Sequence, residues 1–289
     1  MTLPLAALRG PFKIDGPTCI SFSGGRTSAY MLWRVLQSNG GLPSDAVVCF
    51  ANTGKEEEQT LEFVRECESR WNVPIVWVEY RPDAPGYAVV NFETASRNGE
   101  PFEAIIRKRN YLPNPVTRFC TVELKIRSMH KHLTTLGWRN GDGWDQMIGI
   151  RADEQRRVAK IHARPSPETV KETMIMPLAD AGVTVHDVTA FWDAQPFNLQ
   201  LPTYKGRTLA GNCDLCFLKP AGQVLSLIQQ RPSRAVWWSK MEALALASKP
   251  SGAVFRSDRP SYAAMAANAA DQAVLFDVNE EGAACFCGE

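Results

Sequence analysis

The stretch Thr18-Cys19-Ile20-Ser21-Phe22-Ser23-Gly24-Gly25-Arg26-Thr27-Ser28 decides the fold of this chain. Its apolar and β-branched first half predicts a short strand over residues 19–23. After the glycine pair, apolar residues recur at helical spacing, which predicts a helix over 27–38. A strand, a glycine turn and a helix in this order present backbone N–H groups at a helix N-terminus, where the helix dipole favours an anion. A phosphate or sulfate is therefore the expected ligand of this turn. The alternative is that the turn is an ordinary strand-to-helix connection that binds nothing.

Strands and helices continue to alternate after this turn. Residues 47–50, 75–79 and 146–150 form further β-rich runs, and 56–71 and 121–136 have helical patterns. This alternation predicts an α/β fold with a Rossmann-like parallel sheet and helices on both faces. Segment 81–118 has five prolines and no clear period, so we expect an excursion over the C-terminal edge of the strands, where ligands bind. Residues 174–176 are a candidate last strand.

The pattern changes after residue 184. Helices are predicted over 185–194, 221–230, 234–247 and 261–270, whereas 196–220 has a loop-like composition and contains Cys213-x-x-Cys216. We therefore expect an α/β domain over 1–184 and a C-terminal, mainly helical region over 185–289 that carries the CxxC motif and a Cys-rich tail.

Composition is that of an ordinary globular protein, 45% hydrophobic and 22% charged, with a net charge of +1. No global basic field points to nucleic acid. No apolar run approaches the roughly 20 residues that span a bilayer, and the first ten residues do not resemble a signal peptide. We expect a cytoplasmic protein with no membrane contact. Between residues 97 and 131, eight Lys or Arg accompany three Glu, which indicates either a solvated helix face or a polyanion patch.

The eight cysteines fall into two groups. Cys19, Cys49 and Cys67 lie within apolar patterns and are expected to be buried structural residues. The others are candidates for chemistry, because cysteines close in sequence in a reducing compartment are more often ligands or catalytic than disulfides. A CxxC turn places two sulfurs on one side of a loop, which suits a thiolate metal site. A zinc half-site, a redox pair and no site are the alternatives.

Five motifs in order carry a family resemblance. Ser23-Gly24-Gly25-x-x-Ser28 after a first strand resembles the PP-loop of the adenine nucleotide alpha-hydrolase superfamily. The others are Asn52-Thr53-Gly54 with Thr60 and Phe63, Arg118-Phe119-Cys120-Thr121 with Leu124-Lys125, Gly149-Ile150-Arg151-Ala152-Asp153-Glu154, and Pro177-Leu178 followed by Gly211-Asn212-Cys213-Asp214-Leu215-Cys216. Over residues 18–220 the chain is similar to the PAPS reductase family, specifically to its iron–sulfur members.

The resemblance implies that the α/β domain binds an adenine nucleotide, ATP or a sulfonucleotide. The implied binding residues are Ser21, Ser23, Gly24, Gly25, Arg26, Thr27, Ser28, Asn52, Thr53, Gly54, Gly149, Arg151, Asp153, Glu154 and Arg157.

Charged residues in these motifs have implied roles. Lys125 and Arg151 are the expected catalytic cations for the substrate's anionic groups. Asp153 and Glu154 either hold the guanidinium of Arg151 or bind Mg²⁺. Two positions depart from the family. Asn52 stands where Asp is common, and Thr27 stands where ATP-cleaving members often carry Asp, which argues against ATP cleavage.

The iron–sulfur members use a cysteine pair near position 120 together with a later CxxC to hold a 4Fe-4S cluster. Phe119 replaces the first member of that pair, so one ligand is missing, and the tail can supply it. The expected metal ligands are Cys120, Cys213, Cys216 and Cys285, with Cys287 as the alternative fourth. Zinc or no metal are the alternatives, because four thiolates also suit zinc.

Cys287-Gly288 resembles the mobile Cys-Gly end of sulfonucleotide reductases, whose thiolate attacks the sulfate sulfur. Cys287 is thus a candidate catalytic nucleophile if Cys285 is the ligand. The expected function is an adenine-nucleotide-dependent sulfur-chemistry enzyme that resembles PAPS reductase. The alternatives are an ATP pyrophosphatase for nucleic-acid thiolation or phosphorothioation, and a non-enzymatic binding module with a structural metal. A nucleic acid or a thiol carrier is a candidate partner, and a homo-oligomer is left open.

Overall fold

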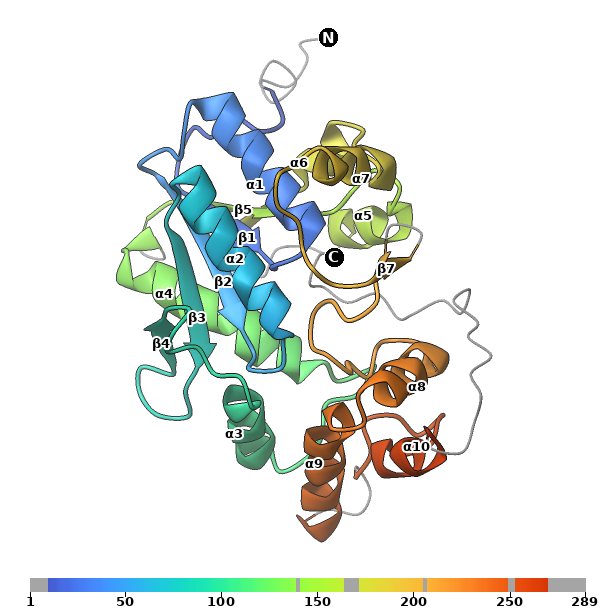
Figure 1. The fold of residues 1–289 in the computed structure, drawn as a ribbon. Coiled ribbons are helices and arrows are strands. Elements are labelled where there is room, and N and C mark those ends of the chain that lie inside the picture. Colours follow the sequence, from blue (N-terminus) through green and yellow to red (C-terminus); the bar gives the residue numbers. More distant parts are fainter. Residues whose placement is uncertain (1–9, 139–140, 164–171, 205–206, 249–252, 270–289) are drawn as a thin grey trace.

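The computed structural model describes residues 10–138, 141–163, 172–204, 207–248 and 253–269 (Figure 1). Its centre is a six-stranded sheet in the order β4-β3-β2-β1-β5-β6. Every neighbouring pair is parallel except β3 and β4, which pair antiparallel. The strands are β1 (Thr18–Phe22), β2 (Ala46–Asn52), β3 (Ile75–Tyr80), β4 (Tyr87–Val90), β5 (Trp144–Ile148) and β6 (Glu172–Ile175). The α/β class expected from the sequence is confirmed.

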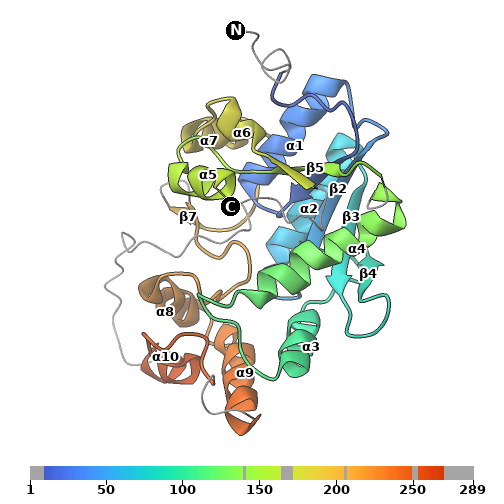
Figure 2. The same cartoon turned by 180° about the vertical axis from the view of Figure 1, so that it is seen from behind.

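Helices cover both faces of the sheet. Along β1, Ile20 belongs to the larger core that packs under α1 (Arg26–Asn39) and α2 (Glu58–Trp71), whereas Cys19 belongs to a second cluster under α4 (Arg127–Thr135). This alternation follows from the two-residue period of a strand, which sends successive side chains to opposite faces. Figures 1 and 2 show α1 and α2 on one side of the sheet and α4 on the other.

The segment 81–118 differs from its expectation, because it contains an edge strand and a helix. β4 is specified by its antiparallel pairing with β3, which no local period reveals. In α3 (Glu100–Arg109), Phe102, Ile105 and Ile106 are buried at helical spacing, and Pro101 occupies the start of the helix, where its missing N–H is harmless. The helix expected over 121–136 begins with a π-helical turn, η2 (Thr121–Ile126), and continues as α4.

The C-terminal region is mainly helical, as expected. Its elements are α7 (Val185–Asp193), the short pair β7 (Thr203–Tyr204) and β8 (Arg207–Thr208), α8 (Ala221–Gln230), α9 (Arg234–Ser248) and α10 (Tyr262–Ala269). The helices α5 (Gln155–His162) and α6 (Pro177–Asp180) precede it. In α7, Trp192 donates a hydrogen bond from Nε1 to the carbonyl of Arg26 at 2.9 Å, which fixes α7 against α1. The boundary at residue 184 stays a prediction.

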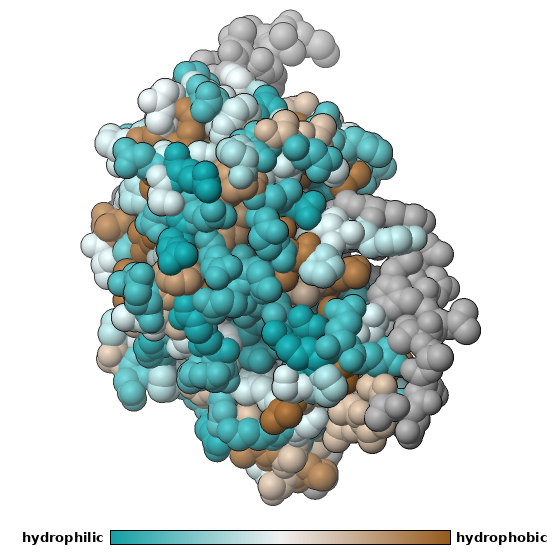
Figure 3. All heavy atoms as spheres, in the orientation of Figure 1, coloured by the Kyte–Doolittle hydropathy of each residue, from teal (hydrophilic) through white to brown (hydrophobic). Residues whose placement is uncertain are grey.

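Most of the face in Figure 3 is hydrophilic, with apolar side chains scattered over it. None of the helices in the described part of the chain combines the length and apolarity that crossing a membrane requires. In the basic segment 97–131, Arg97 pairs with Glu58, Arg107 with Glu103, and Arg109 and Arg127 both with Glu123. Because these four arginines are already paired with carboxylates, they favour the interpretation of the segment as a solvated helix face over that of a patch that binds a polyanion.

Candidate functional site

The loop between β1 and α1 is held by its own serines. The N–H of Ser23 donates to Ser28 Oγ at 3.1 Å, and the two hydroxyl oxygens lie 2.8 Å apart. Ser28 Oγ also donates to the carbonyl of Gly25 at 3.0 Å. Gly25, the residue before α1, makes no side-chain capping hydrogen bond, so among the described residues no side chain caps this helix N-terminus. Such a helix start suits an oxyanion.

Gly24 allows a second helix to approach the same loop. Its φ is +76°, a region that favours glycine, and a Cβ placed on it would lie 2.6 Å from Thr60 Cγ2 in the first turn of α2. The loop is therefore packed directly against the starts of α1 and α2.

Gly149 brings the end of β5 against the start of α1. A Cβ on Gly149 would lie 3.0 Å from Ser28 Cα, a backbone atom that cannot move aside easily. Two residues later, Arg151 Nη1 donates to Thr27 Oγ1 at 3.1 Å. Two carboxylates hold the same guanidinium, because Asp153 Oδ1 lies 3.0 Å from Nε and Glu154 Oε2 lies 3.8 Å from Nη1. The structure thus brings Arg151, Asp153 and Glu154 to the glycine loop.

Two further predicted residues, Arg157 and Arg26, lie beside this group. Arg157 forms an ion pair with Glu154 through Nη1. Arg26 donates from Nη2 to the hydroxyl of Thr203, and burial lowers the pKa of its guanidinium, while nearby Asp193 opposes that shift. Arg26 is therefore directed toward β7 and α7.

A small pocket lies over the glycine loop. One wall is formed by the loop and α2, and the other by the segment between α7 and α8. Its lining residues are Ser23, Gly24, Gly25, Thr60, Leu199, Thr208, Gly211 and Asn212. Leu199, Thr208, Gly211 and Asn212 therefore cover the glycine loop.

Asn52, at the end of β2, is fully buried in a hydrogen-bond network. Its Nδ2 donates to Glu79 Oε1 at 2.6 Å and to the carbonyl of Ser96 at 2.9 Å. An Asp at this position would put two carboxylates side by side, which is unfavourable, so the neighbouring Glu79 accounts for the amide. A contact between Asn52 and a nucleotide stays a prediction.

Thr53 and Gly54 join the β2 loop to other segments. Thr53 Oγ1 lies 3.4 Å from Cys213 Sγ and 2.8 Å from Glu56 Oε1. The carbonyl of Gly54 accepts a hydrogen bond from the N–H of Gly99 at 2.8 Å, and the two glycines are in contact. The loop after β2 is therefore packed between the CxxC segment and the start of α3.

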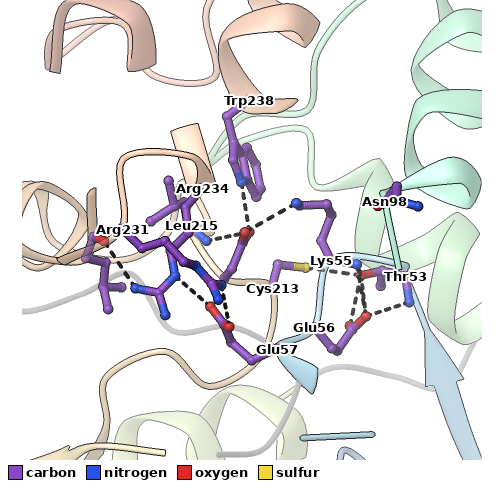
Figure 4. Close-up of polar contacts among 12 residues, drawn as sticks. Thr53, Lys55, Glu56, Glu57, Asn98, Cys213, Leu215, Arg231, Arg234 and Trp238 are labelled. Atoms are coloured by element: carbon purple, nitrogen blue, oxygen red, sulfur yellow. Dashed lines mark hydrogen bonds and ion pairs between the residues drawn. The ribbon is translucent and has the colours of Figure 1, made fainter. Parts of the chain in front are cut away.

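Buried charges dock the CxxC loop on the loop after β2 (Figure 4). Lys55 Nζ lies 3.2 Å from Asp214 Oδ2, and both side chains are about nine-tenths buried. Asp214 Oδ1 accepts a hydrogen bond from Trp238 Nε1 at 2.9 Å. Glu57 accepts hydrogen bonds from Arg231 and Arg234, at 2.6 and 2.8 Å. The sequence did not reveal these ion pairs. Two features could have indicated them, the acidic residue inside the CxxC and the lysine directly after Asn52-Thr53-Gly54.

The two described thiols of the CxxC lie in one turn, in which the N–H of Cys216 donates to the carbonyl of Cys213 at 3.2 Å. Burial, and then the nearby Glu56, raise the pKa of Cys213 well above its ordinary value, whereas Lys125 lowers it. Lys125 on η2 therefore acts electrostatically on the thiol, and Cys120, which is half-buried, directly precedes η2.

The structure describes only part of the expected set of metal ligands. Two cysteines in one turn fit half of a thiolate site, but within the described ranges no three His, Cys, Asp or Glu are grouped so as to hold a metal ion. Cys285 and Cys287 lie outside the described residues. The cluster with Cys120, Cys213 and Cys216 therefore stays a prediction. Cys19, Cys49 and Cys67 are buried, as expected.

Comparison with known proteins gives two findings. The phosphoadenosine phosphosulfate reductase domain family matches residues 17–198, a range that contains the glycine loop, the Arg151 motif and α7. The uncharacterized nin region protein ORF290 of Escherichia phage lambda is 33% identical over 214 residues, which cover 71% of this chain and 67% of that protein.

Proposed function

This chain belongs to the phosphoadenosine phosphosulfate reductase domain family, and from that premise we propose that it is an adenine-nucleotide-dependent enzyme of sulfur chemistry. The observation that carries the proposal is the uncapped start of α1 beside Arg151, whose Nη1 is 3.1 Å from Thr27 Oγ1. Helix N–H groups and a guanidinium at one point form a site for a phosphate or sulfate group.

The residues around the loop have distinct tasks in this proposal. The N–H groups at the start of α1 bind the oxyanion, and Arg151 neutralises its charge. Asp153 and Glu154 hold the guanidinium of Arg151 in the free protein, so the oxyanion competes with two carboxylates for it. Lys125 acts as the second cation, on the side of the pocket where Cys213 lies, because its charge opposes the burial that raises the pKa of that thiol.

For the sulfur chemistry we propose a 4Fe-4S cluster held by Cys120, Cys213, Cys216 and Cys285, with Cys287 as the alternative fourth ligand or as the nucleophile. Support comes from the family membership and from the CxxC turn, which Lys55 fixes beside the loop after β2. A bound cluster supplies a redox-active centre. Anaerobic purification tests it: we expect a coloured protein with iron and acid-labile sulfide, and a colourless protein containing zinc would refute it.

Product analysis tests the reaction. We expect the protein to bind adenosine 3′-phosphate 5′-phosphosulfate or ATP in isothermal titration calorimetry. With a dithiol added to supply the two electrons and be oxidised to a disulfide, release of sulfite from the sulfonucleotide supports a reductase. Release of pyrophosphate from ATP supports the alternative, activation of an acceptor such as a nucleic acid for thiolation. The hydrogen bond from Arg151 to Thr27, where an acidic residue would serve metal-assisted ATP cleavage, favours the first outcome. Binding without turnover of either nucleotide would indicate a non-enzymatic module.

A further inference from the structure

Thr60 has a buried hydroxyl that the fold does not use. The residue is 2% exposed and lies in the first turn of α2, where it lines the pocket over the glycine loop. Its Oγ1 has no hydrogen-bond partner within the part of the chain that the structure describes. Its methyl carbon Cγ2 is the atom that packs on Gly24.

A hydroxyl in this state destabilises the free protein. Leaving a buried polar group unsatisfied costs about 1–3 kcal/mol, and a threonine in a helix ordinarily avoids this by donating to the carbonyl four residues earlier. Thr134 and Thr189 do so, each at 2.8 Å from the carbonyl of His130 and Val185 respectively. Thr60 lies in the first turn, where the residue four positions earlier, Glu56, precedes α2, so this route is closed to it. Valine would fill the same space without a polar atom. An unsatisfied buried group of this kind needs an explanation, and an ion or ligand that binds beside it is one.

The surroundings of Thr60 indicate the chemistry of that partner. Ser23, Gly24 and Gly25 share the pocket wall with it, and the start of α1 follows directly. Thr208, Gly211 and Asn212 enclose the opposite side. A group that accepts several hydrogen bonds at a helix N-terminus fits this enclosure, and a tetrahedral oxyanion has that property.

We propose that Thr60 is a positioning residue for the nucleotide, and that its hydroxyl donates a hydrogen bond to a phosphate or sulfate oxygen bound at the start of α1. This inference rests on the proposed function. In this proposal α2 is a second helix that contacts the oxyanion, beside α1. The free protein keeps an unsatisfied donor so that the bound anion can satisfy it.

Two variants separate this role from a structural one. Thr60→Val keeps the contact with Gly24 and removes only the donor, and Thr60→Ser keeps the donor and removes the methyl group. Calorimetric titration with adenosine 3′-phosphate 5′-phosphosulfate and with ATP should show Thr60→Val binding about tenfold more weakly or worse, because hydrogen bonds to charged groups are the strong ones. Thr60→Ser should stay within about threefold of the parent protein.

Adenosine and thermal unfolding provide the controls. Adenosine carries no oxyanion, so its affinity in a competition titration should be equal in all three proteins. The unfolding temperature of ligand-free Thr60→Val should equal or exceed that of the parent protein, because the variant removes an unsatisfied group. Equal nucleotide affinity of Thr60→Val and the parent would overturn the inference, as would a fall in unfolding temperature together with weaker adenosine binding.

The outcome for Thr60 can be told apart from the outcome for the proposed function. If the parent protein binds the nucleotides and Arg151→Gln weakens that binding while Thr60→Val does not, the inference on Thr60 is wrong and the proposed function stands. If the parent protein binds neither nucleotide, both are wrong.

Discussion

Lys55 Nζ lies 3.2 Å from Asp214 Oδ2, and this buried ion pair joins the loop after β2 to the middle of Cys213-x-x-Cys216. The second oxygen of Asp214 is bonded to Trp238 and to the N–H of Leu215, so the carboxylate is satisfied on both sides. The thiol-bearing turn is therefore fixed to the same edge of the sheet that carries the glycine loop, although the two segments are far apart in the sequence.

Removing Lys55 should destabilise the protein strongly. Lys55→Met leaves Asp214 buried with one partner fewer, and breaking a buried pair from one side costs about 3–5 kcal/mol. The exposed pair of Lys240 and Glu103 offers a matched control, because Lys240→Met should cost less than about 1 kcal/mol. Urea-induced unfolding measures both free energies. Equal effects of the two substitutions would show that the Lys55 pair is not a buried anchor.

Gly149→Ala should disturb both stability and nucleotide binding. The added Cβ would lie 3.0 Å from Ser28 Cα, so β5 and the start of α1 must separate. Overpacking of this kind costs about 1–3 kcal/mol. Gly16→Ala is the control, because a Cβ there meets nothing within 4 Å. Thermal unfolding and calorimetric titration should both change for Gly149→Ala alone, and an unchanged affinity would mean that the loop tolerates the shift.

Charge at Arg151 should govern affinity for the anion. Arg151→Gln removes the cation beside Thr27 and should weaken nucleotide binding by about tenfold or more. Asp153→Asn should act in the opposite direction, by about twofold to fivefold, because it releases the guanidinium from a carboxylate 3.0 Å away. Titration at two salt concentrations tests both, since the effects must shrink as salt rises. Tighter binding by Arg151→Gln would contradict the assigned role.

His132 on α4 should make the protein less stable in acid. Burial lowers the pKa of its imidazole, and its Nδ1 has no hydrogen-bond partner within the described ranges. As the pH falls below about 6.5, the unfolded chain takes up a proton that the folded chain resists, so stability is lost toward lower pH. His132→Phe keeps a ring against Tyr87 and should unfold with a smaller difference between pH 8 and pH 5.5. An identical difference in both proteins would exclude this contribution.

Local patterns were sufficient to predict β1, the glycine loop and α1, because hydrophobic period and glycine chemistry act within a few residues. They were insufficient for β4, whose place depends on pairing with β3. The prolines of segment 81–118 led to the prediction of an irregular segment, so α3 was not predicted, although Phe102, Ile105 and Ile106 have helical spacing.

For the site too, local patterns predicted some features, and others depend on contacts between distant segments. Motifs indicated Gly149 and Arg151, with Arg151 as a cation for the substrate, but gave no structural reason for the place of either residue. The structure supplies contacts with Ser28 and Thr27 as that reason. The pairing of Lys55 with Asp214 and the unsatisfied hydroxyl of Thr60 depend on chain segments that meet only after folding.

The most direct test of the account is a crystal structure with adenosine 3′-phosphate 5′-phosphosulfate or ATP bound, prepared anaerobically. We predict phosphate or sulfate oxygens within hydrogen-bond distance of the first N–H groups of α1, with Arg151 and Thr60 in contact with the same group. A nucleotide bound elsewhere, or a loop from Ser23 to Ser28 that stays empty at saturating nucleotide, would contradict it.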